Sequence, residues 1–195
     1  MKQIRTFIAI KLDETINAAL ADLQRQLKAK APQGSVRWVR PEGIHLTLKF
    51  LGDVPVNRIE EIKQALIQAC VGFPAFSFSV GGLGCFPNPR RPRVVWVGVQ
   101  EESGTLAGLQ KAIEDGMEKL GFAPEGRRFH AHLTLGRTQR RASSGDVRRL
   151  GQLVSEAEIG PLGQMEARAV SLIKSDLRPT GAVYTQLAAV RLEGT

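Results

Sequence analysis

Two short stretches of the sequence repeat the same four residues and carry side chains that suit acid–base chemistry. The tetrapeptide His-Leu-Thr-Leu occurs at residues 45–48 and again at residues 132–135. The chain contains three histidines, so the repeat uses two of them. An imidazole with an ordinary pKa of about 6.5 can accept or donate a proton near neutral pH. Two such groups on opposite sides of a phosphorus atom can activate a water molecule and protonate the leaving oxygen.

The alternation of side chains along a β-strand gives each repeat a meaning. Residues i and i+2 of a strand point to the same side, so His45 shares a face with Thr47, and His132 with Thr134. The leucines between them turn to the opposite, buried face. Threonine hydroxyls can donate hydrogen bonds to the non-bridging oxygens of a phosphodiester, where negative charge develops. The pattern therefore predicts phosphodiester chemistry by proton transfer and hydrogen bonding, with no metal and no cofactor.

Two other interpretations of the histidines stay open at this point. A single strand histidine is usually a structural residue whose ring nitrogens are satisfied by neighbours. His130 lies on the same strand face as His132, and the two could combine with His45 in a three-histidine zinc site. A zinc site leaves the threonine beside each repeated histidine without a role, so the acid–base pair is the preferred interpretation.

The elements that must position these residues can be read from apolar periodicity. We expect strands at residues 5–11, 36–39, 44–52, 76–84, 94–99, 129–137, 165–177 and 183–193. We expect helices at residues 14–30, 55–71 and 102–120. A polar, basic loop is expected at 138–150, with a short helix after Gly145, and a turn at 178–182. Lys49 is expected on the histidine face as a solvent-exposed lysine.

The composition is that of a basic globular protein. The chain has 195 residues, 43% of them hydrophobic, and a formal net charge of +8. This length suits one domain or two small lobes that share a core, and the positive charge favours anionic partners. Cys70 and Cys85 have no metal-binding spacing and are expected to be buried. No apolar run approaches the roughly 18 residues of a membrane span, so we expect a cytoplasmic protein without a membrane partner.

Several longer segments surround these motifs and carry a family resemblance. They are RTFIAI at 5–10, WV at 38–39 followed by HLTLKFLG at 45–52, FHAHLTLGR at 129–137, and S-x-L-x-P-x-G-x-x-Y at 175–184. With these segments the chain resembles the two-histidine (2H) phosphoesterases, and among them the RNA 2',3'-cyclic phosphodiesterases, also called 2'-5' RNA ligase-like proteins. The resemblance extends over nearly the whole chain.

This resemblance implies an α+β fold and an activity. The fold would be a single bilobal domain over residues 1–195 with an internal duplication. Two antiparallel sheets with pseudo-twofold symmetry would surround a central groove, and the helices would lie outside. The activity would be hydrolysis of a terminal 2',3'-cyclic phosphate to a 2'-phosphate. Some relatives also join RNA ends reversibly through a 2'-5' bond.

The resemblance also assigns roles to residues. His45 and His132 would be the acid–base pair, with Thr47 and Thr134 binding the phosphate. Arg137 matches the arginine that follows the second motif and would neutralise the phosphate. Strict alternation from His132 would turn Arg137 away, so we expect Gly136 to let the strand bend.

The resemblance also suggests two aromatic residues near the groove and a class of substrate. Phe7 and Trp38 match positions near the groove that can support stacking. The expected partners are RNA 3' ends or cyclic nucleotides, and the protein is expected to be a monomer. A non-catalytic RNA-binding module remains an alternative, as does a phosphodiesterase that acts on small nucleotides or on 2',5'-linked oligonucleotides. The sequence does not decide which histidine is the acid.

Overall fold

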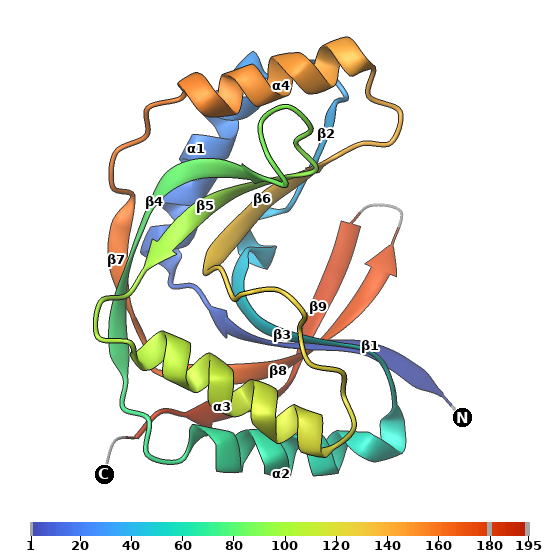
Figure 1. Cartoon of the computed structure of the whole chain (residues 1–195), viewed down its shortest axis with the longest axis vertical. Helices are drawn as coiled ribbons and strands as arrows, with labels where there is room; N and C mark the ends of the chain where they lie inside the picture. Colours follow the sequence, from blue (N-terminus) through green and yellow to red (C-terminus); the bar gives the residue numbers. More distant parts are fainter. Residues whose placement is uncertain (1, 179–180, 194–195) are drawn as a thin grey trace.

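The structure is a computed structural model that describes residues 2–178 and 181–193 (Figure 1). In this part of the chain one antiparallel sheet has the strand order β7-β4-β5-β6-β3-β1-β8-β9, and β2 pairs with β6. The strands are β1 (Gln3–Lys11), β2 (Val36–Trp38), β3 (His45–Pro55), β4 (Phe76–Phe86), β5 (Val94–Gln100), β6 (His132–Thr138), β7 (Gly163–Ala167), β8 (Ala169–Arg178) and β9 (Gly181–Arg191). The helices are α1 (Glu14–Lys30), α2 (Ile59–Cys70), α3 (Thr105–Lys119) and α4 (Ser144–Glu156), with 3-10 turns η1 (Pro41–Gly43) and η2 (Val56–Arg58).

The sheet consists of two halves that meet at a single point. Strands β7, β4, β5, β6 and β2 form one half, and β3, β1, β8 and β9 form the other. The halves pair only through Leu46 of β3 and Leu133 of β6 among the described residues. Helices α1 and α4 pack at one end of the curled sheet, and α2 and α3 at the other (Figure 1). The expected α+β bilobal fold with external helices is confirmed, and its two sheets are joined edge to edge.

Local sequence signals account well for the first helix. Asp13 caps α1, since its side chain accepts a hydrogen bond from the Ile16 backbone N–H at 2.8 Å. Apolar residues at helical spacing are buried along one face, from Ile16 through Leu20 to Leu27. The predicted bounds, 14–30, are those of the structure.

A β-bulge lies at the last residue of each His-Leu-Thr-Leu repeat. In the β1–β3 register Ile8 pairs with Lys49 and Ala9 with Thr47, so Leu48 has no partner of its own. The β5–β6 register skips Leu135 in the same way. A bulge inserts one extra residue and re-aims the side chains that follow it. Each strand therefore changes its alternation directly after the motif.

The bulge in β3 explains why the prediction for Lys49 was wrong. Leu48 and Lys49 both point to the buried side, and Lys49 is only 3% exposed. Its ammonium lies 2.5 Å from the Glu114 carboxylate on α3 and donates to the Ala123 carbonyl at 3.0 Å. Lys49 is therefore one member of a buried ion pair between β3 and α3.

Two predictions in the second half of the chain need correction. The short helix expected after Gly145 is present as α4, but it begins at Ser144 and runs to Glu156, so the loop expected at 138–150 is shorter than predicted. Ser143 and Asp146 form a capping box at its start, in which each side chain accepts from the backbone of the other. The single strand expected at 165–177 is divided into β7, which pairs with β4, and β8, which pairs with β1 and β9. Residues 179–180 of the expected turn lie outside the described part.

Other expectations concern burial. Cys70 and Cys85 are both buried and unpaired, as predicted. Burial raises the pKa of the Cys70 thiol to about 11. No helix in the described part of the chain is long and apolar enough to cross a membrane.

Candidate active site

A pocket of about 170 Å³ lies where the two half-sheets meet. Both repeats contribute to its wall, as do residues of β1, β8 and β9. Its lining residues are Arg5, Phe7, Val39, Gly43, Ile44, His45, Thr47, Phe50, Thr134, Arg137, Ser175, Leu177 and Tyr184. The structure thus brings together most of the residues predicted from the two motifs, although they are far apart in the sequence.

The two repeated histidines are held in the same way. The Nδ1 atom of His45 lies 2.8 Å from the Gly43 carbonyl oxygen, and that of His132 lies 2.6 Å from the His130 carbonyl oxygen. A carbonyl can only accept, so each Nδ1 carries a proton and donates it. Each Nε2 is then the nitrogen that can take up or release a proton. The two imidazoles are therefore oriented for proton transfer by backbone groups two residues earlier.

His132 lies beside the pocket rather than among its lining residues, yet it is coupled electrostatically to His45. Burial lowers the pKa of His45, the hydrogen bond to Gly43 opposes this, and the charge of His132 lowers it further. Burial also lowers the pKa of His132, the hydrogen bond to His130 raises it, and the charges of His130 and Arg137 lower it. Two neighbouring imidazoles of lowered pKa are rarely protonated together. In the singly protonated pair, one histidine can act as the acid and the other as the base.

The phosphate-binding residues expected from the sequence line the same pocket. Thr47 and Thr134 do so from β3 and β6, and Arg137 follows Thr134 past the bulge at Leu135. We expected β6 to bend near Gly136, and the strand does so through the bulge at Leu135, one residue before the glycine. A Cβ atom on Gly136 would lie 2.6 Å from Val36, so only glycine lets β2 approach β6 this closely.

The two predicted aromatic residues have different surroundings. Phe7 lines the pocket, but its ring is 3% exposed and stacks on His45 with the ring centroids 4.5 Å apart. Trp38 is not among the lining residues of this pocket. Its ring packs against the hydrophobic core and lies under the Lys28 ammonium at 5.9 Å. The structure therefore does not bring Trp38 to the pocket, because β2 turns that side chain to the core.

Sequence reasoning missed several pocket residues. Phe50 occupies the position after the β3 bulge that corresponds to Arg137 after the β6 bulge, and it is 53% exposed. Tyr184 packs edge-on against both Phe7 and His45 at 5.3 and 5.2 Å. Burial raises the pKa of its phenol, while Arg137, Arg37 and Arg5 lower it. Phe50 lies in the segment HLTLKFLG at 45–52, but only the bulge shows that it faces the pocket.

His130 contributes a backbone carbonyl to the site, and its ring packs against Trp96 at 4.9 Å and Phe86 at 5.3 Å. Within residues 2–178 and 181–193, no three His, Cys, Asp or Glu side chains are placed to hold a metal ion. The structure therefore does not assemble the three-histidine zinc site that the sequence left open.

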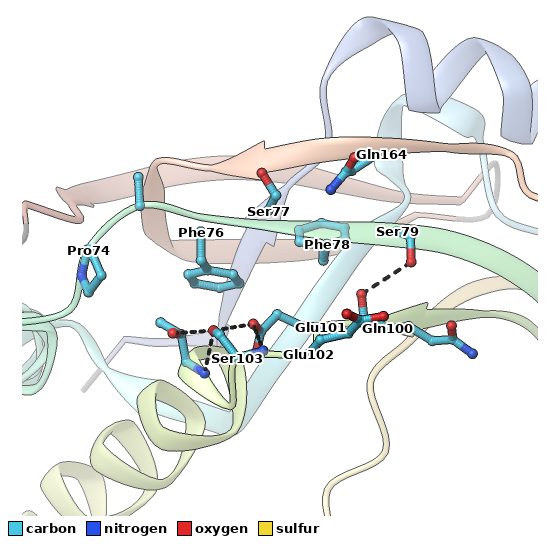
Figure 2. Close-up of a pocket in the computed structure, with 12 residues that line it drawn as sticks. Pro74, Phe76, Ser77, Phe78, Ser79, Gln100, Glu101, Glu102, Ser103 and Gln164 are labelled. Atoms are coloured by element: carbon cyan, nitrogen blue, oxygen red, sulfur yellow. Dashed lines mark hydrogen bonds between the residues drawn. The ribbon is translucent and has the colours of Figure 1, made fainter.

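A larger hollow, of about 700 Å³, lies elsewhere, between the start of β4 and the start of α3 (Figure 2). Its polar lining consists of serine, threonine and glutamine side chains with Glu101 and Glu102. Glu101 accepts hydrogen bonds from Ser103 and from the Leu106 backbone (2.7 and 3.0 Å) and so caps α3. Two carboxylates and the lack of any lining histidine or arginine make this hollow unsuitable for phosphodiester chemistry.

This chain is similar in sequence to known phosphoesterases, and the similarity includes both His-Leu-Thr-Leu repeats. The family model for LigT-like phosphoesterases matches residues 10–96 and again residues 97–184. An RNA 2',3'-cyclic phosphodiesterase of Methanothermobacter thermautotrophicus is 37% identical over 190 residues, covering 97% of this chain and 100% of that protein. A protein of the same name from Aquifex aeolicus is 30% identical over 195 residues, covering 100% of both.

Solved structures share the fold. The protein TT0787 of Thermus thermophilus has a TM-score of 0.78 at 26% identity, over 98% of this chain and 99% of that one. Escherichia coli LigT complexed with 3'-AMP has a TM-score of 0.76 at 23% identity, over 98% of this chain and 99% of that one. The family model covers both motif-bearing halves, and the relatives from Methanothermobacter thermautotrophicus and Aquifex aeolicus match along their full length. The chain therefore belongs to the LigT-like phosphoesterase family.

Proposed function

We propose that this chain hydrolyses the 2',3'-cyclic phosphate at RNA 3' ends to a 2'-phosphate, with His45 and His132 as a metal-independent acid–base pair. One observation carries the proposal. Both histidines donate Nδ1–H to a backbone carbonyl, which leaves both Nε2 atoms to transfer protons beside the paired threonines. The relatives named RNA 2',3'-cyclic phosphodiesterase support the choice of substrate.

The proposed reaction needs two proton transfers. One Nε2 takes a proton from water while the water oxygen bonds to phosphorus. The bond from phosphorus to the 3' oxygen breaks, and the other Nε2 gives its proton to that oxygen. The products are a 2'-phosphate and a 3'-hydroxyl. A 5'-hydroxyl in place of water would give a 2'-5' linkage by the same transfers.

The negative charge that builds on the non-bridging oxygens needs stabilisation. Thr47 and Thr134 line the pocket with hydroxyls that can donate to these oxygens, and Arg137 adds a positive charge. Phe50 is the exposed aromatic ring of the pocket, and we assign it the stacking of the terminal base. Phe7, covered by His45, Phe50 and Tyr184, supports the histidine ring instead.

The proposal also includes the domain organisation, the oligomeric state and the cellular compartment of the protein. The family model matches two consecutive stretches that each contain one repeat, which supports a single bilobal domain with an internal duplication. We expect the protein to act on RNA 3' ends as a monomer. Two unpaired, buried cysteines agree with a reducing compartment such as the cytoplasm.

The decisive experiment identifies the product. A short RNA ending in a 2',3'-cyclic phosphate is incubated with the purified protein in excess EDTA. A 2'-phosphate is the expected product, whereas a 3'-phosphate would keep the acid–base pair and reverse the leaving oxygen. Turnover only with added zinc would contradict the metal-independent mechanism. No turnover under either condition would favour the RNA-binding module, and preferred cleavage of 2',5'-linked oligonucleotides would favour that alternative substrate.

A further inference from the structure

Two arginines lie directly opposite each other at the edge of the pocket. In the antiparallel pairing of β2 with β6, Arg37 is the cross-strand partner of Arg137. Directly opposite residues have Cα atoms about 4.5–5.5 Å apart and point their side chains to the same face. Like charges in this position destabilise a sheet. The pair therefore needs a compensating negative charge.

The protein does not supply this charge from the residues that the structure describes. The carboxylates in its ion pairs belong to Asp22, Glu60, Glu61, Glu114, Asp115, Asp146, Glu166 and Asp176. None of these pairs includes Arg37 or Arg137. A local conflict of this kind, left without compensation beside a pocket, is typical of a ligand site.

Arg37 is held at the edge of the pocket by a contact between the two half-sheets. Its Nη2 atom donates to the backbone oxygen of Arg178, the last residue of β8, at 3.4 Å. Arg37 thus extends from β2 in one half-sheet to β8 in the other. Ser175 and Leu177 of β8 line the pocket, so this bridge lies at its rim. Within residues 2–178 and 181–193 this is the one side-chain hydrogen bond of Arg37, so its other guanidinium donors can bind a ligand.

A third arginine strengthens the positive field at this rim. Arg5 lines the pocket from β1, two residues before Phe7 on the same strand face. Arg5, Arg37 and Arg137 are all close enough to the Tyr184 phenol to lower its pKa. More positive charge is gathered here than one scissile phosphate needs, which points to a second phosphate group.

We propose that Arg37 binds the phosphodiester on the 5' side of the terminal nucleotide, next to the scissile phosphate held by Arg137. The inference rests on the proposed function and names the feature by which the site distinguishes an RNA end from a cyclic mononucleotide. A terminal nucleotide with a 2',3'-cyclic phosphate is linked to the rest of the RNA only through its 5' oxygen. Any further phosphate of that strand therefore lies on the 5' side.

The test compares three substrates in the full-length protein. They are adenosine 2',3'-cyclic phosphate, the dinucleotide with the same cyclic end, and that dinucleotide with an uncharged methylphosphonate linkage. We expect kcat/KM of the wild type to favour the charged dinucleotide by about 10-fold to 100-fold, the range of a charge-assisted hydrogen bond. Arg37→Gln should abolish this preference through KM and leave the other two substrates nearly unchanged.

A matched variant controls for loss of net charge. Arg25→Gln removes one positive charge from the exposed face of α1, where Arg25 pairs with Asp22, and should keep the preference. Equal losses on all three substrates in Arg37→Gln, or a wild type without preference, would overturn the subsite while leaving the activity intact. If no substrate is turned over, the proposed activity fails. In that case the affinities of Arg37→Gln and Arg25→Gln for a 3'-phosphorylated dinucleotide and for its methylphosphonate form test the role of Arg37 without turnover. Only Arg37→Gln should lose the preference for the charged linkage.

Discussion

Leu46 of the first motif lies directly opposite Leu133 of the second in the antiparallel strands β3 and β6. In an antiparallel pair the neighbours of opposite residues run in opposite directions. His45 is thus beside Thr134, and Thr47 is beside His132. Both leucines are fully buried, so the four polar side chains lie on the other face. The pairing of these two leucines between the half-sheets thereby places each histidine beside the threonine of the other motif.

This arrangement predicts that the two histidines are separately essential. His45→Ala and His132→Ala should each lower kcat by about 10²–10⁴, the usual contribution of a general acid or base. The double variant should be little worse than either single variant, because the two groups act in one step. Steady-state kinetics on a cyclic-phosphate substrate measure the effect, and urea unfolding checks that the variants fold. His130→Asn is the control, and a variant of His45 or His132 that matches it would refute the acid–base pair.

The lowered pKa values of both histidines predict the pH dependence of kcat/KM. The reaction needs one protonated and one neutral imidazole, so activity is lost when the last proton leaves the pair. A lowered pKa means that this loss occurs at lower pH, so the alkaline limb should have its midpoint below about 6.5. Arg137 lowers the pKa of His132, so Arg137→Gln should move this limb to higher pH while reducing kcat/KM. A limb that stays in place or moves to lower pH would contradict the coupling.

The buried ion pair between Lys49 and Glu114 predicts an asymmetric effect on stability. Glu114 also accepts from the Glu125 backbone at 2.7 Å, so the pair fastens the loop before His132 to β3. Glu114→Leu leaves a charged lysine buried and should lower the free energy of unfolding by about 3–5 kcal/mol. Lys49→Met combined with Glu114→Leu should recover much of this loss, since apolar replacement of a whole buried pair is often neutral.

Urea unfolding provides the measurement for this pair. Lys111→Met is the control, because Lys111 and Asp115 form an exposed pair on α3 that should contribute less than about 1 kcal/mol. A double variant as unstable as Glu114→Leu would show that the burial of an unpaired charge is not the cause.

Strand alternation predicted that each histidine shares a face with the threonine two residues later, and it holds because no bulge lies within these three residues. It failed one position later, where Leu48 and Leu135 form bulges. A bulge depends on the pairing strand, which periodicity within one segment does not include. Lys49 was therefore placed in solvent and Phe50 was overlooked.

The division of the expected strand at 165–177 has a similar cause. The segment is apolar enough for one long strand, and β7 and β8 are separated only because they pair with different half-sheets. The Tyr184 ring packs closely on Gly43 at the pocket, where a Cβ atom would lie 3.1 Å from the ring. Both features depend on tertiary contacts between residues that are distant in the sequence.

The exposed ring of Phe50 predicts a dependence on the terminal base. Stacking on an aromatic ring contributes about 1–3 kcal/mol per base, so Phe50→Ala should lower kcat/KM for a cyclic nucleotide by roughly 10-fold to 100-fold, mainly through KM. Ribose 2',3'-cyclic phosphate, which lacks a base, should be hydrolysed by both proteins at similar rates. Phe50→Leu keeps the apolar contact with Phe7 and should still lose the stacking. Ile67→Ala, an exposed apolar residue on α2, is the control. Equal losses with and without the base would mean that Phe50 acts through Phe7 on His45, and the stacking role would be abandoned.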